Sequence, residues 1–216
     1  KIFGIKVISV RHTQLHTEDL ILNKFKNSIY FFFAQFSDYI VCVSEFVFNN
    51  LYKKGFKNLK HIPNWAHRRF KKKSVPKRYN DELYHVLAVS RLDISKGHLD
   101  LFEACRELDK IQIHLVGDGP DKQLFKNYSK DLNVIFHGYK QDVLPFYINC
   151  DLLVLPSYYE GGNPFCLLEG IAVGITCLGS DIPPIQEVLG KDYVFKKGSI
   201  PELKRKILDL RSKKYL

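Results

Sequence analysis

Short apolar runs alternate with segments in which apolar residues recur every three or four positions along most of the chain. Uninterrupted runs, such as residues 152–155, are typical of strands that are buried on both faces of a sheet. Residues 45–54 have the helical period instead, and Gly55 follows them as a helix-ending residue. Because strands separated by single helices form right-handed βαβ units, the pattern predicts an α/β fold: a Rossmann-like parallel sheet with helices on both faces.

The predicted elements form two series. In the first, we expect strands at 5–10, 39–43 and 59–62 and helices at 18–36 and 45–54. In the second, we expect strands at 84–89, 111–116, 133–136, 151–155 and 176–178, and helices at 97–108, 120–129, 141–149 and 164–173. The segment between them is rich in cations and holds two prolines, which favours a boundary. We therefore expect one domain at 1–63, a basic linker at 64–82 and a second domain at 83–216.

The composition of the 216-residue chain, with 45% hydrophobic and 26% charged residues, is that of an ordinary globular protein. It excludes collagen-like, low-complexity and disordered classes. The five cysteines include no CxxC pair and stand mostly in apolar runs, which favours buried reduced thiols over a metal or disulfide site. The longest uncharged apolar stretch, 27–37, is shorter than the roughly 20 residues of a membrane span. We expect a cytoplasmic protein without a transmembrane helix.

The net charge of +10 is concentrated in one segment. Residues 46–80 contain no acidic residue, and eleven Lys and Arg residues lie between Lys53 and Arg78. Such a cluster beside an aromatic stretch can attract a protein to an anionic membrane surface, at about 1 kcal/mol per basic residue. A solvated linker, extended by charge repulsion, is the alternative. Nucleic-acid binding is disfavoured, because no RNP strand or zinc-finger spacing accompanies the cations.

Ligands of open parallel sheets bind at the carboxyl ends of the strands, so the residues after each predicted strand are candidates. Arg91 and Lys96 follow the strand at 84–89. A rigid guanidinium fork and a mobile ammonium group suit a diphosphate whose charge grows as it leaves. Two surface cations are commonplace, however, and solvated side chains are the simpler interpretation of this pair alone.

Two glycines, Gly117 and Gly119, follow the strand at 111–116 and allow a close backbone approach to a ligand. Pro120 suits the first position of the next helix. The third glycine of a dinucleotide fingerprint would stand at 122, where the chain has Lys122. This disfavours a Rossmann dehydrogenase.

The loop after the strand at 151–155 holds the most candidate residues. Asn163 suits the N-cap of a helix and Pro164 its first position, and two glycines expose backbone N–H groups just before them. Glu160 stands before this helix start and Glu169 inside the helix. The two carboxylates can therefore reach different parts of one ligand. Taken singly, Glu160 is equally consistent with an exposed loop acid, and Glu169 with an exposed helix residue.

No two aspartates stand two positions apart, so the chain lacks the acidic pair with which many sugar-nucleotide enzymes hold a divalent cation. We expect no metal site and no cofactor. If a diphosphate binds, Arg91, Lys96 and helix N-termini must offset its charge.

Five motifs stand in a fixed order over the second domain. They are Ser90-Arg91-Leu92 with Lys96-Gly97, Val116-Gly117-Asp118-Gly119-Pro120, Phe136-His137-Gly138-Tyr139, Pro156-Ser157-Tyr158-Tyr159-Glu160-Gly161 with Leu167-Leu168-Glu169-Gly170, and Ser180-Asp181-Ile182-Pro183-Pro184-Ile185-Gln186-Glu187-Val188. This succession resembles the nucleotide-sugar half of the retaining glycosyltransferases of family four, glycosyl transferases group one, which have the GT-B fold. Upstream, Val10-Arg11-His12 resembles a late strand of the acceptor-side domain, and Ile62-Pro63-Asn64 resembles the crossing between the two domains.

The resemblance implies roles for individual residues. Arg91 and Lys96 would hold the donor diphosphate and Glu169 the ribose hydroxyls. Glu160, with the backbone from Gly161 to Asn163, would contact the donor sugar, and His12 would lie near the transferred sugar. We expect the catalytic set to be Glu160, His12, Arg91 and Lys96. We expect the donor-binding set to be Gly117, Gly119, His137, Gly138, Gly161, Gly162, Asn163, Pro164 and Glu169.

Two features depart from the family pattern. Eight residues separate Glu160 from Glu169, where the family usually has seven, which suggests a one-residue insertion at the two glycines. The chain also contains no Met and is short for two Rossmann-like domains. We therefore expect the C-terminal half of a GT-B enzyme preceded by the truncated end of the acceptor-side domain, a fragment that binds a donor better than it turns it over.

The resemblance implies transfer of a sugar from a nucleoside diphosphate donor, with uridine as the expected base, to an acceptor hydroxyl with retention of configuration. The acceptor would be a glycan or a lipid-linked glycan in surface polysaccharide or glycolipid assembly, and no nucleic acid would take part. Two alternatives stay open. One is a non-catalytic nucleotide-binding or membrane-docking module, and the other is a nucleotide-sugar epimerase of the same fold.

Overall fold

A computed structural model describes residues 8–11, 32, 34, 36–71, 79 and 82–214. The chain forms two compact units. The first consists of the described residues up to Asn64 together with Glu160–Pro164, and the second of Trp65–Tyr159 and Phe165–Leu216. The predicted His12, most of the predicted helix at 18–36, and Lys72, Lys73, Lys77 and Arg78 of the basic segment lie outside the described residues.

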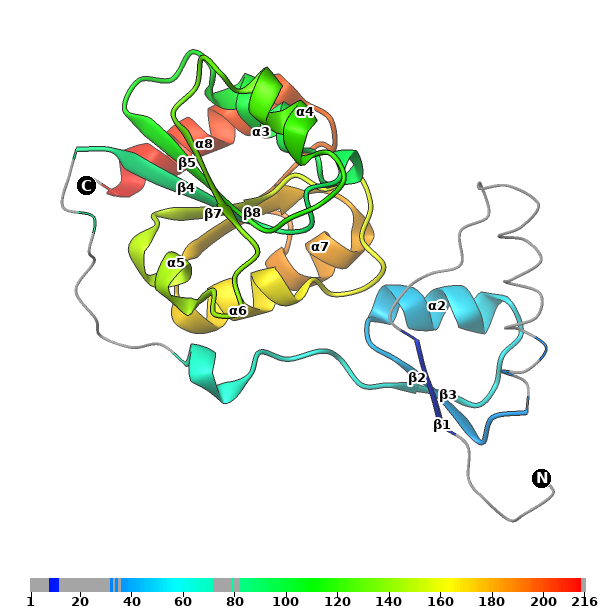
Figure 1. Cartoon of the computed structure of the whole chain (residues 1–216). Coiled ribbons are helices and arrows are strands. Elements are labelled where there is room, and N and C mark those ends of the chain that lie inside the picture. Colours follow the sequence, from blue (N-terminus) through cyan, green and yellow to red (C-terminus); the bar gives the residue numbers. More distant parts are fainter. Residues whose placement is uncertain are drawn as a thin grey trace. The chain divides into compact units, whose positions relative to one another are not determined.

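The first unit contains a three-stranded parallel sheet in the order β1-β2-β3 (Figure 1). Its strands are β1 (Ile8–Arg11), β2 (Tyr39–Cys42) and β3 (Leu59–His61), and helix α2 (Glu45–Lys53) connects β2 to β3. Ser44 caps α2, because its hydroxyl accepts a hydrogen bond from the Val47 amide at 3.1 Å. The helix buries Val47 and Leu51 against Ile40 and Cys42, so its apolar stripe forms the core of this unit.

The second unit is built on a six-stranded sheet in which all neighbouring strands are parallel. Its strands are β4 (Tyr84–Val89), β5 (Ile111–Val116), β6 (Val134–Gly138), β7 (Leu152–Leu155), β8 (Thr176–Ser180) and β9 (Val194–Phe195). Its helices are η1 (Arg68–Phe70), η2 (Ile94–Lys96), α3 (His98–Cys105), α4 (Lys122–Tyr128), α5 (Leu144–Asn149), α6 (Phe165–Val173), α7 (Pro183–Leu189) and α8 (Ile200–Lys214). The parallel α/β architecture predicted from the apolar pattern is confirmed.

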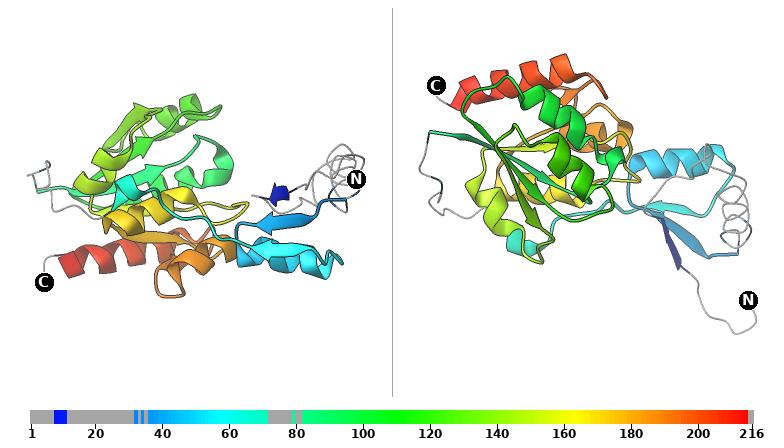
Figure 2. Two further views of the ribbon diagram at one scale, coloured as in Figure 1. Left: turned by 90° about the horizontal axis from the view of Figure 1, so that it is seen from below. Right: turned by 45° about the horizontal axis from the view of Figure 1, so that its top comes forward.

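Helices cover both faces of this sheet (Figure 2). On one face, the buried residues of β4 and β5 pack against α3, α4 and α8, with Phe102, Phe125 and Leu203 among the fully buried side chains. On the other, η1, α5, α6 and α7 supply Phe70, Tyr147 and other core residues. Cys42, Cys105, Cys150 and Cys177 are buried, and Cys166 is partly buried.

The strand order β6-β5-β4-β7-β8-β9 places a topological switch point at the centre of the sheet. The connection from β4 leads to one side, and the later strands continue on the other side of β4, beginning with β7. In open parallel sheets, ligands bind outside the carboxyl ends of the two strands at such a point. The loops after β4 and β7 are therefore the expected position of a ligand.

Several helix ends differ from the prediction. The first α residue after β5 is Lys122 rather than Pro120, and Asp121 occupies the N-cap position. The Asp121 carboxylate makes no capping bond and accepts a hydrogen bond from the Ile94 amide at 2.8 Å. Helix α3 ends at Cys105, three residues earlier than predicted. Helix α6 begins at Phe165, directly after Pro164. The elements α7, β9 and α8 were not predicted.

Candidate functional site

The carboxyl edge of the six-stranded sheet brings together most of the predicted site residues of the second unit. Arg91 and Lys96 lie after β4, and Gly117 and Gly119 lie after β5. His137 and Gly138 end β6, and Glu169 lies in α6, the helix after β7. Parallel strands end at the same edge, so these residues come from four neighbouring connections.

The loop with the two predicted cations is held by its own hydrogen bonds. Asp93 Oδ1 accepts from the Ser95 amide at 3.0 Å and from the Ser95 hydroxyl at 2.7 Å, which caps η2. These bonds, together with the charges of Arg91 and Lys96, lower the pKa of the Asp93 carboxyl, so that it is ionised at neutral pH. Arg91 is exposed, and Lys96 is partly exposed. The bonds to Asp93 hold the loop in place after β4, at the carboxyl edge of the sheet.

The glycines after β5 lie against the loop after β4. A β carbon on Gly117 would lie 1.9 Å from the carbonyl oxygen of Ser90, and one on Gly119 would lie 2.2 Å from that of Leu92. Both distances are far below a van der Waals contact, so neither position has room for a side chain. The sequence analysis explained these glycines by the close approach of a ligand to the backbone. The packing of the loop after β5 on the loop after β4 by itself requires glycine at both positions.

His98, the first residue of α3, was not predicted as a site residue. Its Nε2 lies 2.9 Å from the Ser90 hydroxyl, which in turn donates to the Arg91 carbonyl at 3.2 Å. Burial lowers the pKa of His98 to about 4, so the ring is neutral at neutral pH. The sequence signal that could have identified His98 is its position as a polar residue directly after Lys96-Gly97.

Glu169 contacts a residue that the sequence analysis missed. The Tyr147 hydroxyl in α5 donates a hydrogen bond to Glu169 Oε2 at 3.0 Å. Burial raises the pKa of Glu169, while the Tyr147 hydrogen bond and the Arg69 charge act in the opposite direction. The carboxylate is therefore half-buried in α6 with one oxygen already bonded.

His137 is the end of a row of three histidines on β4, β5 and β6. His85 Nδ1 lies 3.0 Å from His114 Nε2, and His114 Nδ1 lies 2.9 Å from His137 Nε2. Burial and then the Lys140 charge lower the pKa of His137. One ring nitrogen of this predicted donor-binding residue is thus bonded within the sheet.

The first part of the loop after β7 is anchored within the second unit. The Tyr158 amide donates to the Ser95 carbonyl at 2.8 Å, and the Tyr158 hydroxyl donates to Asp100 Oδ2 at 2.7 Å. The Ser180 hydroxyl donates to the Ser157 carbonyl at 2.5 Å. The loops after β4, β7 and β8 are therefore joined by hydrogen bonds at the switch point.

The remainder of this loop belongs to the first unit. It holds the predicted residues Glu160, Gly161, Gly162, Asn163 and Pro164. Within that unit, Asn64 Nδ2 donates to the Asn163 carbonyl at 3.2 Å. The predicted site residues are thus divided between the two units, with the cations and Glu169 in the second.

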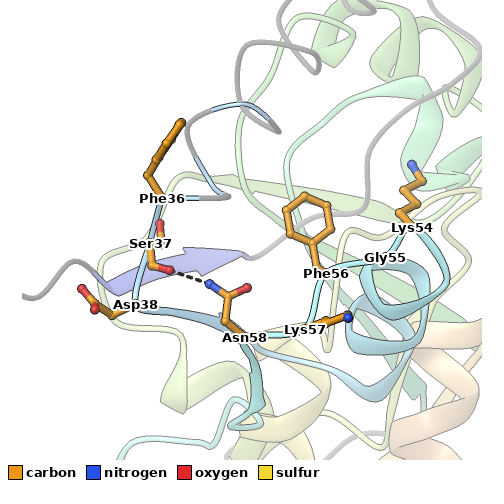
Figure 3. A pocket seen from close by; sticks show the side chains of 8 residues that line it. All are labelled: Phe36, Ser37, Asp38, Lys54, Gly55, Phe56, Lys57 and Asn58. Carbon is orange, nitrogen blue, oxygen red and sulfur yellow. Dashed lines mark hydrogen bonds between the residues drawn. The ribbon is translucent and has the colours of Figure 1, made fainter. Parts of the chain in front are cut away.

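The first unit also has a cavity of about 780 Å³ beside the amino ends of β2 and β3 (Figure 3). Lys54 and Lys57 of the basic segment line it, together with Phe36 and Phe56. Among the predicted catalytic and donor-binding residues that the structure describes, none lines this cavity.

The described part of the chain contains no group of three or more His, Cys, Asp or Glu side chains that could hold a metal ion. Within the same residues, every helix is too short or too polar to cross a membrane.

Residues 84–213, which include the whole six-stranded sheet, match the family described as glycosyl transferases group 1. The chain belongs to this family. The matched region covers more than half of the chain and contains Arg91, Lys96 and Glu169. The family resemblance predicted from the five motifs is confirmed.

Two glycosyltransferases are related to this chain in sequence. Lipopolysaccharide 1,6-galactosyltransferase of Salmonella typhimurium is 35% identical over 118 residues, which cover 50% of this chain and 33% of that protein. An uncharacterized glycosyltransferase of Methanocaldococcus jannaschii is 27% identical over 216 residues, covering 94% and 59%. The chain thus spans less than two thirds of the length of either relative.

Solved structures share the fold. The crystal structure of Anabaena HepE in complex with UDP and glucose has a TM-score of 0.83 and 17% identity, covering 97% of this chain and 63% of that one. Sucrose-phosphate synthase from Thermosynechococcus elongatus has a TM-score of 0.79 and 18% identity, covering 97% and 59%. These likenesses confirm the predicted GT-B fold class.

Proposed function

We propose that this protein is part of a glycosyltransferase that moves a sugar from a UDP-linked donor to an acceptor hydroxyl with retention of configuration. The observation that carries the proposal is the fixed loop after β4, which presents Arg91 and Lys96 beside the switch point of the sheet. Membership of the glycosyl transferases group 1 family supports it. The UDP and glucose in the HepE crystal structure support the choice of donor.

In this proposal, the donor lies along the carboxyl edge of the second unit. Arg91 and Lys96 offset the diphosphate charge, and Glu169 accepts hydrogen bonds from the ribose hydroxyls. Fixed cations at the departing diphosphate stabilise the charge that develops in an oxocarbenium-like transition state. We propose that they do so without a metal ion, because no two aspartates stand two positions apart in the sequence. The proposed donor-binding set also includes Gly117, Gly119, His137 and Gly138.

The residues proposed to contact the transferred sugar are Glu160 and the backbone of Gly161, Gly162, Asn163 and Pro164, with His12 nearby. A contact to the reacting sugar acts on turnover, whereas a contact to ribose acts equally on the bound donor and the transition state. In the complete enzyme, Glu160→Ala should therefore lower kcat, and Glu169→Ala should raise the donor KM. The reverse pattern would contradict this division of roles.

We propose an acceptor of polysaccharide or glycolipid assembly, supported by the lipopolysaccharide galactosyltransferase among the relatives. Such acceptors lie near membranes. Lys53, Lys54, Lys57 and Lys60, all in the first unit, are exposed and form the described beginning of the basic segment. We further propose that this surface attracts the protein to an anionic leaflet.

A thermal-shift screen of UDP, GDP, ADP, uridine and UDP-glucose tests the donor class. A nucleotide at 100 times its Kd should stabilise the fold by about 2.7 kcal/mol. We expect stabilisation by UDP and UDP-glucose and none by uridine, which lacks the diphosphate. Stabilisation by none of the nucleotides would contradict the proposal. Isomerisation of the free nucleotide sugar without an acceptor would favour an epimerase instead.

A further inference from the structure

Tyr147 and Glu169 form a hydrogen-bonded pair between helices α5 and α6. The hydroxyl donates to Glu169 Oε2 over 3.0 Å. Tyr147 is only 1% exposed, whereas Glu169 is partly exposed. The hydrogen bond therefore runs from the core of the second unit to a carboxylate near its surface.

The surroundings of the Tyr147 ring fix its direction. The ring meets Phe70 of η1 edge-on, with centroids 6.0 Å apart and planes at 78°. A buried hydroxyl without an acceptor is costly. The hydrogen bond to Glu169 therefore satisfies the Tyr147 hydroxyl in the core.

This bond has two consequences for the carboxylate. It occupies Oε2 and so fixes the orientation in which Oε1 is presented. It also favours the ionised form, because a phenol donates to a carboxylate more strongly than to a neutral carboxyl. The nearby charge of Arg69 acts in the same direction, against the burial that raises the Glu169 pKa.

We propose that Tyr147 is a positioning residue that binds one oxygen of Glu169 and thereby aims the other at the ribose hydroxyls of the donor. This inference rests on the proposed function, because it assigns the partner of the free oxygen. It adds a residue that the sequence motifs do not contain and that does not itself touch the donor.

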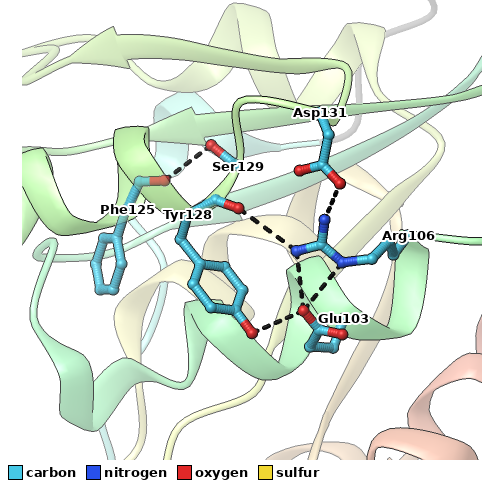
Figure 4. A network of polar contacts seen from close by, with 6 residues as sticks. All are labelled: Glu103, Arg106, Phe125, Tyr128, Ser129 and Asp131. Carbon is cyan, nitrogen blue, oxygen red and sulfur yellow. Dashed lines mark hydrogen bonds and ion pairs between the residues drawn. The ribbon is translucent and has the colours of Figure 1, made fainter.

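A second tyrosine–glutamate pair in the same unit provides a matched control (Figure 4). The Tyr128 hydroxyl donates to Glu103 Oε1 at 2.7 Å, and Arg106 bonds both Glu103 and Asp131. Tyr128 ends α4, which runs back from the carboxyl edge of the sheet. Tyr128→Phe removes the same kind of hydrogen bond far from the proposed ligand.

The experiment compares the parent chain, Tyr147→Phe and Tyr128→Phe by calorimetry with UDP and with 2′,3′-dideoxy-UDP, which lacks both ribose hydroxyls. We expect the parent to prefer UDP, and Tyr147→Phe to reduce that preference about tenfold, the usual scale for a hydrogen bond to a charged group. Tyr128→Phe should keep the preference of the parent. In a Glu169→Gln background, Tyr147→Phe should cause no further loss.

An unchanged preference for UDP in Tyr147→Phe would overturn the inference, as would an equal reduction in Tyr128→Phe. A parent chain that does not bind UDP would contradict the proposed function itself. NMR titration of the Glu169 carboxylate without nucleotide separates the two cases. We expect Tyr147→Phe alone to raise the midpoint of that titration, and an unmoved midpoint would overturn the positioning role.

Discussion

Gly97 lies so close to Pro156 that a β carbon on it would be 2.0 Å from the carbonyl oxygen of Pro156. Gly97 also has a φ of 69°, where it ends η2 and caps the start of α3. It follows the proposed diphosphate-binding Lys96, and Pro156 is the first residue after β7. The contact therefore joins the two loops at the switch point of the sheet.

Gly97→Ala should be strongly destabilising, because it adds both a left-handed conformation and a collision with backbone. Gly198→Ala is the control in the same unit, since Gly198 has a φ of 76° and a β carbon on it would meet no atom closer than 3.5 Å. We expect a loss of about 1 kcal/mol for Gly198→Ala from conformation alone, and at least about 3 kcal/mol for Gly97→Ala. Urea unfolding measures both, and equal losses would contradict the packing argument.

The buried His98 should make the stability of the second unit depend on pH. The pKa of His98 is about 4 in the folded protein, against an ordinary value of 6.5 for a solvated histidine. Between these values the unfolded chain binds more protons, so stability falls as the pH drops from 6.5 towards 4. At 1.36 kcal/mol per pKa unit, the loss amounts to roughly 3 kcal/mol.

Urea unfolding at pH 7 and at pH 5 tests this dependence. His98→Gln keeps a polar side chain but cannot titrate, so its stability should change less between the two pH values. If parent and variant lose the same stability on acidification, other groups cause the dependence.

The exposed lysines at the end of α2 should govern binding to anionic vesicles. Lys53, Lys54 and Lys57 changed together to Glu should weaken co-sedimentation about a hundredfold or more, at about 1 kcal/mol for each lost contact. Binding by the parent should fall with added salt, because the interaction is screened beyond about 8 Å at physiological ionic strength.

A charge-matched control changes three exposed lysines of the second unit, Lys130, Lys191 and Lys213, to Glu. We expect this control to pellet with anionic lipid like the parent, and both triple variants to keep UDP binding. Equal pelleting of the two variants, or no preference for anionic over neutral lipid, would leave the basic segment as a solvated linker.

The central strands could be predicted from the sequence because burial alone determines them. Residues 84–89 and 111–116 are mostly apolar segments between polar ones, and β4 and β5 have those bounds. The missed helix α8 also had a signal, since Leu203 and Ile207 stand four apart and are both fully buried. The type of each predicted element could be inferred from its periodicity. The position of the switch point required the strand order, which the structure supplies.

The contacts at the candidate site depended on tertiary structure. Tyr147 stands at a buried position of a predicted helix, but its partner Glu169 lies 22 residues away on another helix. The row from His85 to His137 requires the register of three strands. The Asp121 carboxylate, at the N-cap of α4, accepts from the amide of Ile94, 27 residues earlier, and no local sequence pattern contains this contact.

The central claim is that Arg91 and Lys96 bind a nucleoside diphosphate without a metal ion. Calorimetry with UDP in EDTA tests it on the parent, on Arg91→Ala with Lys96→Ala, and on Arg205→Ala with Lys206→Ala of α8 as a control. We expect the parent and the control to bind alike, and the loop variant to bind at least about a hundredfold more weakly, because it loses two charge-assisted contacts. Binding that appears only with Mg²⁺ or Mn²⁺, or that survives loss of both loop cations, would contradict the account.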